Sequence, residues 1–152
     1  IAVPANGLPE GIQVIRLFED ELYFASSKSK KPKQAEIDLS DYQHEKFLTL
    51  QDGFATTSGF YEAFHLAGYK PNVVMKVGDI FSLMNMVSSD MGMTLLPGRV
   101  KALMGDSIEF TPLSRRYQVI QNIALMYLQA NESNPNILAL AAEARMLHRN
   151  KT

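Results

Sequence analysis

The stretch KFLTLQDGFATTSGFYEAFHLAGYKPNVVMKVGDIFSLMNMVSSDMGMTLLP, residues 46–97, decides the fold, because extended and helical patterns alternate along it. Short apolar runs at 46–50, 72–77 and 92–97 predict strands. A helix is predicted at 58–68, and a second helix after Asp79. Strands that alternate with helices indicate a parallel sheet whose strands are buried on both faces. We therefore expect an α/β lobe.

The two predicted helices have recognisable ends and apolar faces. Ser58 and Asp79 are typical N-cap residues, and Gly68 is typical of a helix end. Pro71 prevents the first helix from continuing. The residues expected to face the core are Phe60, Ala63, Phe64 and Ala67 in the first helix, and Ile80, Leu83, Met84 and Val87 in the second.

The flanks of this stretch predict a second lobe. Residues 12–27 read as two extended segments joined by an acidic turn, Glu19 to Glu21. Further on, 107–113 and 117–129 read as extended, and a helix is predicted at 135–148, with Asn134 as its cap and Pro135 in its first position. The lysine-rich connector at 26–34 is expected to be solvated and to mark a boundary. The lobes expected are 28–112, and 1–27 together with 113–152.

Composition excludes several classes of function. The 152 residues include 15 Lys and Arg against 16 Asp and Glu, so the chain has no basic excess with which to bind nucleic acid by itself. Cysteine is absent, which excludes disulfides and thiolate chemistry and favours a reducing cytoplasm. The longest apolar run, 123–128, is too short to cross a membrane. The chain begins with Ile in what reads as the end of a buried strand, and we therefore expect a fragment.

The loop at 51–58 is the candidate site. It follows a predicted parallel strand, where ligand crevices form and helices begin with unpaired N–H groups. Thr56, Thr57 and Ser58 add hydroxyl donors for a carboxylate or a similar anion. A plain helix cap with turn glycines explains the same residues. The loop lacks the G-x-S-x-G pattern of a hydrolase, and Phe60 stands where a phosphate-binding P-loop needs lysine.

No metal or cofactor site is indicated. The histidines His44, His65 and His148 lack the close spacing of a helical metal site. The acidic residues Glu19, Asp20 and Glu21 occupy a predicted turn, where solvated carboxylates are common. We expect no bound metal, no cofactor and no enzymatic activity.

Residues 47–100 resemble the effector-binding domain of LysR-type transcriptional regulators. The family's pattern of a helix ending before a proline falls on Phe64, Ala67, Gly68 and Pro71. Its second signature reads VSSDMGMTLLP at 87–97, with Asp90 in place of a glycine. The flanking segments IAVP at 1–4 and IQVIRLFEDELYFASS at 12–27 also fit, so the resemblance covers nearly the whole chain.

The resemblance implies an α/β fold of two Rossmann-like lobes, as in periplasmic binding proteins, with the first lobe incomplete. A DNA-binding winged helix-turn-helix would precede Ile1 and lie outside this chain. The implied partners are a small-molecule effector, DNA through that missing domain, and further copies in a homodimer or homotetramer. The helix at 135–148 is a candidate contact between copies. No membrane association is implied.

The resemblance also assigns residues to the effector site. The loop after the first strand of the second lobe lines the site, and the expected effector is a small anionic or polar metabolite. Two other functions remain as alternatives to a regulator's effector-binding domain: a stand-alone solute-binding protein and, less in keeping with the motifs, a small α/β enzyme. The residues implied are Gln51, Gly53, Phe54, Thr56, Thr57 and Ser58, with Val3 and Pro4 opposite them.

Overall fold

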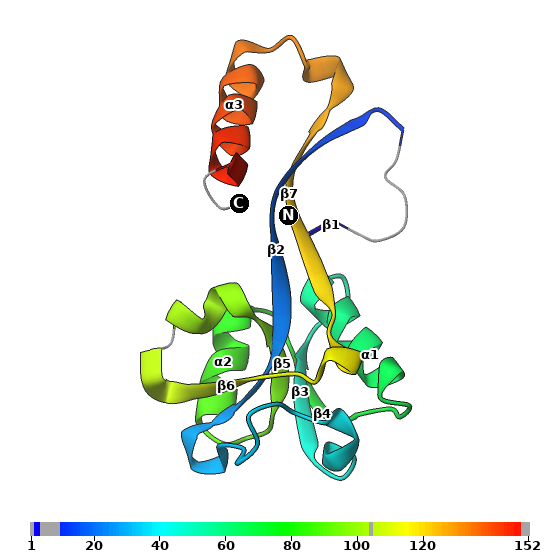
Figure 1. Ribbon diagram of the computed structural model, residues 1–152, viewed down its shortest axis with the longest axis vertical. Coiled ribbons are helices and arrows are strands. Elements are labelled where there is room, and N and C mark those ends of the chain that lie inside the picture. Colours follow the sequence, from blue (N-terminus) through cyan, green and yellow to red (C-terminus); the bar gives the residue numbers. More distant parts are fainter. Residues whose placement is uncertain (1, 4–9, 104, 150–152) are drawn as a thin grey trace. The chain divides into compact units, whose positions relative to one another are not determined.

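A computed structural model describes residues 2–3, 10–103 and 105–149, and the chain divides into two compact units. Unit 2 is the continuous stretch Glu21–Ile120, and unit 1 combines Ile1–Asp20 with Gln121–Thr152. The chain therefore enters unit 2 once and leaves it once, and Figure 1 labels the elements of both units.

Strands and helices alternate along the chain, which confirms the α/β class. Their order is β1 (Ala2–Val3), β2 (Ile12–Ser27), β3 (Lys46–Leu50), α1 (Ala55–Leu66), β4 (Asn72–Val77), α2 (Ile80–Ser88), β5 (Thr94–Pro97), β6 (Ile108–Pro112), β7 (Ile120–Leu128) and α3 (Pro135–Arg149). Short 3-10 helices lie between them at Lys28–Lys30 (η1), Leu39–Tyr42 (η2), Gly98–Leu103 (η3), Gly105–Ser107 (η4), Arg115–Tyr117 (η5) and Gln129–Asn131 (η6).

The strands of unit 2 form a mixed arrangement rather than the wholly parallel sheet predicted. β3 and β4 pair in parallel, but β5 and β6 both pair antiparallel with the second half of β2. A parallel bridge between Phe47 and Met93 links β3 to the start of β5. Gly92 makes this approach possible, because a Cβ there would lie 3.0 Å from the Lys46 carbonyl oxygen. The glycine of the family signature thus has a packing role.

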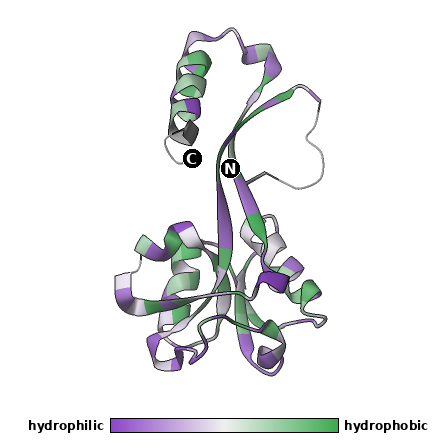
Figure 2. Ribbon diagram, viewed as in Figure 1, coloured by the Kyte–Doolittle hydropathy of each residue, from purple (hydrophilic) through white to green (hydrophobic). Residues whose placement is uncertain are grey.

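The two helices of unit 2 bury the faces predicted from their spacing. Phe60, Ala63 and Phe64 of α1 are almost fully buried, and the rings of Phe64 and Phe47 lie 4.7 Å apart. Both helices mix hydrophobic and hydrophilic residues along their length, so each presents one apolar face (Figure 2). In α2 the buried residues are Leu83, Met84 and Val87. Full burial of such a side chain stabilises the fold by about 1.5–3 kcal/mol.

The ends of these helices also follow the sequence signals. Gly68 adopts a φ of +80° just after α1, as predicted for a left-handed helix end. Asp90 adopts a φ of +63° after α2, where the family has a glycine. An aspartate accepts this conformation at a modest cost, about 1 kcal/mol.

β4 is more exposed than predicted. Val74 and Met75 are 45% and 43% exposed, although the run NVVMKV indicated a strand buried on both faces. Within the described residues β4 has one strand neighbour, β3. A strand with one neighbour has an open side, which explains why its apolar residues are not enclosed.

Unit 1 contains the first half of β2, β1, β7 and α3. β1 pairs antiparallel with β7, and α3 buries Ala141 and Ala144 against Ile15. Asn134 caps α3 as predicted, since its side-chain oxygen accepts the Asn136 N–H at 2.9 Å. The acidic turn predicted at 19–21 does not form, and β2 continues through it as one strand. The reason is an alternation of period two: Asp20 is buried while Glu19 and Glu21 are exposed.

The boundaries of the two units along the chain differ from the lobe boundaries predicted at 27/28 and 112/113. The unit boundaries follow Asp20 and Ile120. Residues Leu22–Ser27 pair with β5 and β6, so the second half of β2 belongs to unit 2. The lysine-rich connector also folds back, with Lys28 and Lys31 each 2.9 Å from Glu109.

Candidate functional site

The candidate site lies where β3 and β4 end. Because these strands are parallel, the loops that follow them lie at the same edge. The Gln51 N–H donates to the Val77 carbonyl at 2.9 Å, which joins the two loops. The Gln51 side chain also lies over Gly78, since a Cβ on Gly78 would stand 4.0 Å from its Oε1. The starts of α1 and α2 therefore face one edge of the β3–β4 pair.

The first turn of α1 has no side-chain cap. The N-cap residue is Phe54, four residues before the predicted cap Ser58, which lies within the first turn instead. The Thr57 and Ser58 N–H groups donate to the Phe54 carbonyl at 3.0 and 3.2 Å. The N–H groups of Ala55 and Thr56 have no acceptor among the described residues. Two backbone donors are thus left for another molecule or water.

The turn before α1 depends on Gly53. Its φ of +97° is a conformation that other residues rarely adopt, and it lets the chain reverse between β3 and α1. Phe54 follows directly, and it is 41% exposed. A large apolar ring therefore stands beside the uncapped helix start.

The three hydroxyl residues of the loop have different surroundings. Thr57 is 3% exposed, and its hydroxyl points back to the Gln51 and Leu50 carbonyl oxygens at 3.0 and 3.2 Å. Because a hydroxyl has one proton, Thr57 holds the loop and has no donor left for an effector. Thr56 is 7% exposed, and no hydrogen bond of its hydroxyl is present among the described residues. Ser58 is exposed.

The one acidic side chain between Gln51 and Phe54 is paired with a lysine. Lys76 of β4 donates to both carboxylate oxygens of Asp52, at 2.9 and 3.1 Å. The hydrogen bond to Asp52 is the largest cause of the raised pKa of Lys76, which burial opposes. Lys76 also lies 5.8 Å from the centre of the Tyr61 ring. The pair reduces the repulsion that Asp52 would exert on an approaching anion.

The start of α2 is closed by its own side chain. Asp79, the predicted cap, accepts the Ser82 N–H at 2.9 Å and the Ser82 hydroxyl at 2.7 Å. These bonds from Ser82 lower the pKa of Asp79, with the hydroxyl as the largest cause. The first turn of α2 is therefore capped by the chain's own carboxylate, that of Asp79.

The remaining predicted site residues are Val3 and Pro4. Val3 lies in β1, opposite Asn122 of β7. Pro4 lies outside the described residues. Lys76 and Gly78 were not among the predicted site residues, although their position at the end of a predicted strand, before a predicted helix, is a signal that indicates them.

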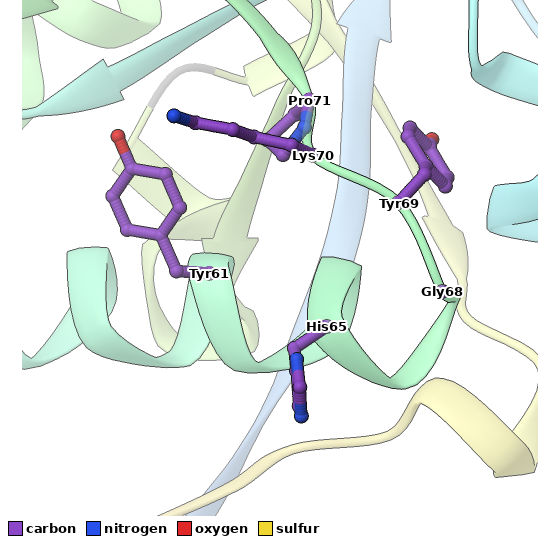
Figure 3. Close-up of a pocket in the computed structure, with 6 residues that line it drawn as sticks. All are labelled: Tyr61, His65, Gly68, Tyr69, Lys70 and Pro71. Atoms are coloured by element: carbon purple, nitrogen blue, oxygen red, sulfur yellow. The ribbon is translucent and has the colours of Figure 1, made fainter.

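A pocket of about 450 Å³ lies elsewhere in unit 2, beside the second half of α1. Figure 3 shows Tyr61 and His65 on α1, and Tyr69, Lys70 and Pro71 on the turn that follows. The Tyr69 hydroxyl is occupied, because it donates to the Leu39 carbonyl at 2.8 Å. None of the predicted site residues lines this pocket.

Across 2–3, 10–103 and 105–149, no group of three His, Asp or Glu side chains is placed to hold a metal ion. In the same part of the chain, no helix is both long and apolar enough to cross a membrane.

Comparison with known proteins decides the family. The sequence model named LysR substrate binding domain matches residues 1–148. The chain belongs to the LysR substrate-binding domain family. This domain is the effector-binding part of LysR-type transcriptional regulators, so the predicted resemblance is confirmed.

The proteins similar to this LysR substrate-binding domain are longer than the chain itself. The malonate utilization transcriptional regulator of Klebsiella pneumoniae is 41% identical over 137 residues, which are 90% of this chain and 44% of that protein. The chain therefore spans less than half of that relative. Full-length CbnR complexed with its target DNA has a TM-score of 0.76 at 21% identity, covering 94% of this chain and 50% of that one.

A second solved structure is that of the regulatory domain of CcmR from Synechocystis PCC6803 in complex with 2-PG. It has a TM-score of 0.84 at 13% identity, and covers 99% of this chain and 72% of that one. At such identities these neighbours show the fold alone. They support the periplasmic-binding-protein-like α/β fold of LysR substrate-binding domains.

Proposed function

We propose that this LysR substrate-binding domain senses a short dicarboxylate, with malonate as the leading candidate, and that one carboxylate of the ligand lies at the start of α1. The observation that carries the proposal is the uncapped first turn of α1, with free N–H groups on Ala55 and Thr56, in a chain 41% identical to a malonate utilization regulator. A helix N-terminus attracts anions through its unpaired N–H groups and its dipole.

The residues of the loop have separate roles in this proposal. The Thr56 and Ser58 hydroxyls donate to the carboxylate together with the free N–H groups, and the Gln51 side chain adds an amide at the same edge. Gly53 allows close approach of the backbone, and Phe54 covers the apolar part of the ligand. Thr57 keeps the loop in place through its bonds to the end of β3.

The expected affinity follows from the number of donors. A helix N-terminus contributes about 0.3–1 kcal/mol toward an exposed anion. Each hydrogen bond to the charged carboxylate adds a net of about 1.5–3 kcal/mol. Even if only three of the five donors named above bond to the carboxylate, these bonds, less the cost of immobilising the ligand, give dissociation constants on the order of 10⁻⁶ to 10⁻⁴ M.

Calorimetric titration of malonate into the chain tests the proposal. We expect saturable binding, and Thr56→Val should weaken it about tenfold or more, because valine keeps the shape of threonine and removes its donor. Thr94→Val is the matched control. Thr94 is the first residue of β5 and lies away from the carboxyl ends of β3 and β4, so its replacement should leave malonate affinity unchanged.

Ligands of related structure sharpen the result. Acetate, with one carboxylate, should bind more weakly than malonate, and malonate should be recovered unchanged after incubation, since we infer a sensor and not an enzyme. Absence of malonate binding at millimolar concentration would contradict the proposed effector. Equal affinity of wild type and Thr56→Val would place the effector away from α1.

We also infer the role of the whole protein. The family membership and the 41% identity to a transcriptional regulator support a transcription regulator that contacts DNA through a domain outside this chain. We infer a cytoplasmic homodimer or homotetramer, in which α3 is a candidate contact because Leu138, Leu140 and Met146 are exposed on it. Sedimentation of the whole protein as a monomer at micromolar concentration would contradict the assembly.

A further inference from the structure

Residues Ile37–Ser40, here named the hub segment, are tied to two stretches of unit 2 that are distant in sequence. The first tie is made by the backbone. The Ile37 N–H donates to the Pro112 carbonyl at 2.8 Å, and the Ile37 carbonyl accepts the Ser114 N–H at 2.9 Å. This parallel bridge holds the hub segment beside the residues that follow β6.

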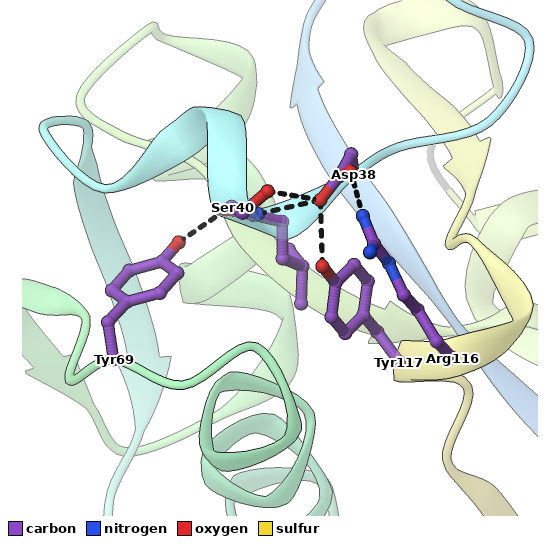
Figure 4. A network of polar contacts seen from close by, with 6 residues as sticks. Asp38, Ser40, Tyr69, Arg116 and Tyr117 are labelled. Carbon is purple, nitrogen blue, oxygen red and sulfur yellow. Dashed lines mark hydrogen bonds and ion pairs between the residues drawn. The ribbon is translucent and has the colours of Figure 1, made fainter.

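Asp38 is the polar centre of the hub segment (Figure 4). Its Oδ1 accepts the Ser40 hydroxyl at 2.5 Å and N–H at 3.0 Å, and the Tyr117 hydroxyl at 2.8 Å, while its Oδ2 pairs with the Arg116 guanidinium. The hydroxyls of Ser40 and Tyr117 are the main reason that the pKa of Asp38 falls to about 2. The carboxylate is therefore ionised at neutral pH and holds η5 against the hub segment.

Two tyrosines connect the hub segment to α1. Tyr117 is 4% exposed and belongs to the same core cluster as Phe60 and Phe64 of α1, while its hydroxyl lies on Asp38. The Tyr69 ring lies 5.3 Å from that of Phe64, and its hydroxyl donates to the Leu39 carbonyl at 2.8 Å. Each tyrosine thus has its ring in the α1 core and its hydroxyl on the hub segment.

The stretch that carries Tyr117 is also the one by which the chain leaves unit 2. Ile120 is the last residue of unit 2, and Val119 is buried in the same core cluster as Tyr117. A shift of α1 therefore presses on residues that directly precede this exit. Coupling through proteins travels along packed side chains and hydrogen bonds of this kind.

We propose that Asp38 is a positioning residue: by holding the Tyr117 hydroxyl, it couples α1 to residues 112–120, the stretch that leaves unit 2. The link to effector binding rests on the function proposed above, in which the ligand lies at the start of α1. If the Asp38–Tyr117 contact differs in strength between the free and the bound state, its removal alters the affinity for the effector.

Amide hydrogen exchange of the ligand-free chain tests the coupling. The variants are Tyr117→Phe, which removes one hydroxyl and keeps the ring, and Asp38→Asn; Glu109→Gln removes a surface ion-pair partner and is the control. Rates are normalised to β3 amides, so that global unfolding is cancelled. We expect exchange of the α1 amides after Ser58 to rise roughly threefold or more in both variants, and not in the control. Faster exchange confined to the hub segment and 112–120 would overturn the proposal.

Malonate titration adds a readout that loss of stability alone does not move. The dissociation constant should rise roughly threefold or more in Tyr117→Phe and stay unchanged in Glu109→Gln. If wild type binds malonate and Tyr117→Phe has the same dissociation constant, this result would also count against the coupling. Failure of wild type to bind malonate would sink the proposed effector instead, and the ligand-free exchange would still decide the role of Asp38.

Discussion

The first turns of α1 and α2 follow neighbouring parallel strands, yet only one of them is closed by its own sequence. At α2, the Asp79 carboxylate accepts both the N–H and the hydroxyl of Ser82. At α1, the corresponding position is Phe54, whose side chain has no acceptor. The same edge of the β3–β4 pair therefore presents one satisfied helix start and one with free donors.

If the start of α1 binds the effector as proposed, this difference is a loss of helix stability that serves binding. Asp and Ser are favoured at the N-cap, and replacing such a residue by an apolar one costs a helix about 1 kcal/mol. The chain follows this preference at α2 and departs from it at α1. A departure from a local rule is expected at functional sites, where activity is retained at some expense of stability.

The largest expected effect is that of giving α1 a side-chain N-cap like that of α2. Phe54→Asp places a carboxylate where it accepts the free N–H groups of the first turn and repels an incoming anion. We expect malonate affinity to fall about tenfold to a hundredfold, while the free energy of unfolding rises by about 0.5–1 kcal/mol. Calorimetry and chemical denaturation measure these opposite changes.

Phe54→Leu is the matched control, because leucine is apolar and also leaves the helix start uncapped. It should retain most of the malonate affinity. If Phe54→Asp stabilised α1 and bound malonate as tightly as wild type, the free donors of α1 would have no part in binding, and the comparison of the two helix starts would lose its functional meaning.

The sequence predicted much of unit 2, and the exceptions have physical causes. β3 and β4 have the predicted bounds, and Asp79 caps α2 as expected, because apolar spacing and cap preference are local signals. β4 was predicted to be buried, but the number of strands beside it depends on tertiary structure. The antiparallel pairing of β2 with β5 likewise joins residues that are distant in sequence.

The N-cap of α1 was predicted four residues late for the reason that makes this helix start a candidate site. Ser58 was the residue most typical of a cap, whereas the true N-cap, Phe54, carries no such signal. Nor does a threonine reveal from sequence which way its hydroxyl points. Thr57 was predicted as a donor to the effector, and its hydroxyl instead faces the carbonyls of Leu50 and Gln51.

The second-largest expected effect is that of removing the Thr57 hydroxyl, which bonds to the carbonyls of Leu50 and Gln51. Thr57→Val removes the hydroxyl that holds the end of β3 to α1, and leaves two carbonyl oxygens without that donor. We expect the free energy of unfolding to fall by about 1–2 kcal/mol, measured by urea denaturation. Malonate affinity should fall less than in Thr56→Val.

Thr94→Val makes the same substitution at another buried threonine of unit 2. The Thr94 hydroxyl is enclosed and has no hydrogen-bond partner among the described residues. Its removal should leave the free energy of unfolding unchanged or raise it by up to about 1 kcal/mol. Equal losses of stability in Thr57→Val and Thr94→Val would show that the hydrogen bonds of the Thr57 hydroxyl contribute no stability of their own.

The smallest expected effect is the pH dependence of the α2 cap, which α1 lacks. The pKa of Asp79 is lowered from 3.8 by the hydrogen bonds of Ser82, so the ionised cap is favoured in the folded state. For a lowered pKa, the stabilisation is complete above the unfolded value of 3.8 and is lost as the pH falls through the folded pKa.

Asp79→Asn provides the matched comparison, because asparagine also caps helices but does not titrate in this range. The melting temperature of wild type should exceed that of the variant at about pH 5, and the difference should shrink by roughly 1–3 °C at about pH 3. Asp38, whose pKa of about 2 makes it lose charge under more acidic conditions, is present in both proteins, so its contribution cancels. A difference that stays constant over this range would mean that the charge of Asp79 adds nothing to the cap, and that the two helix starts differ only in their hydrogen bonds.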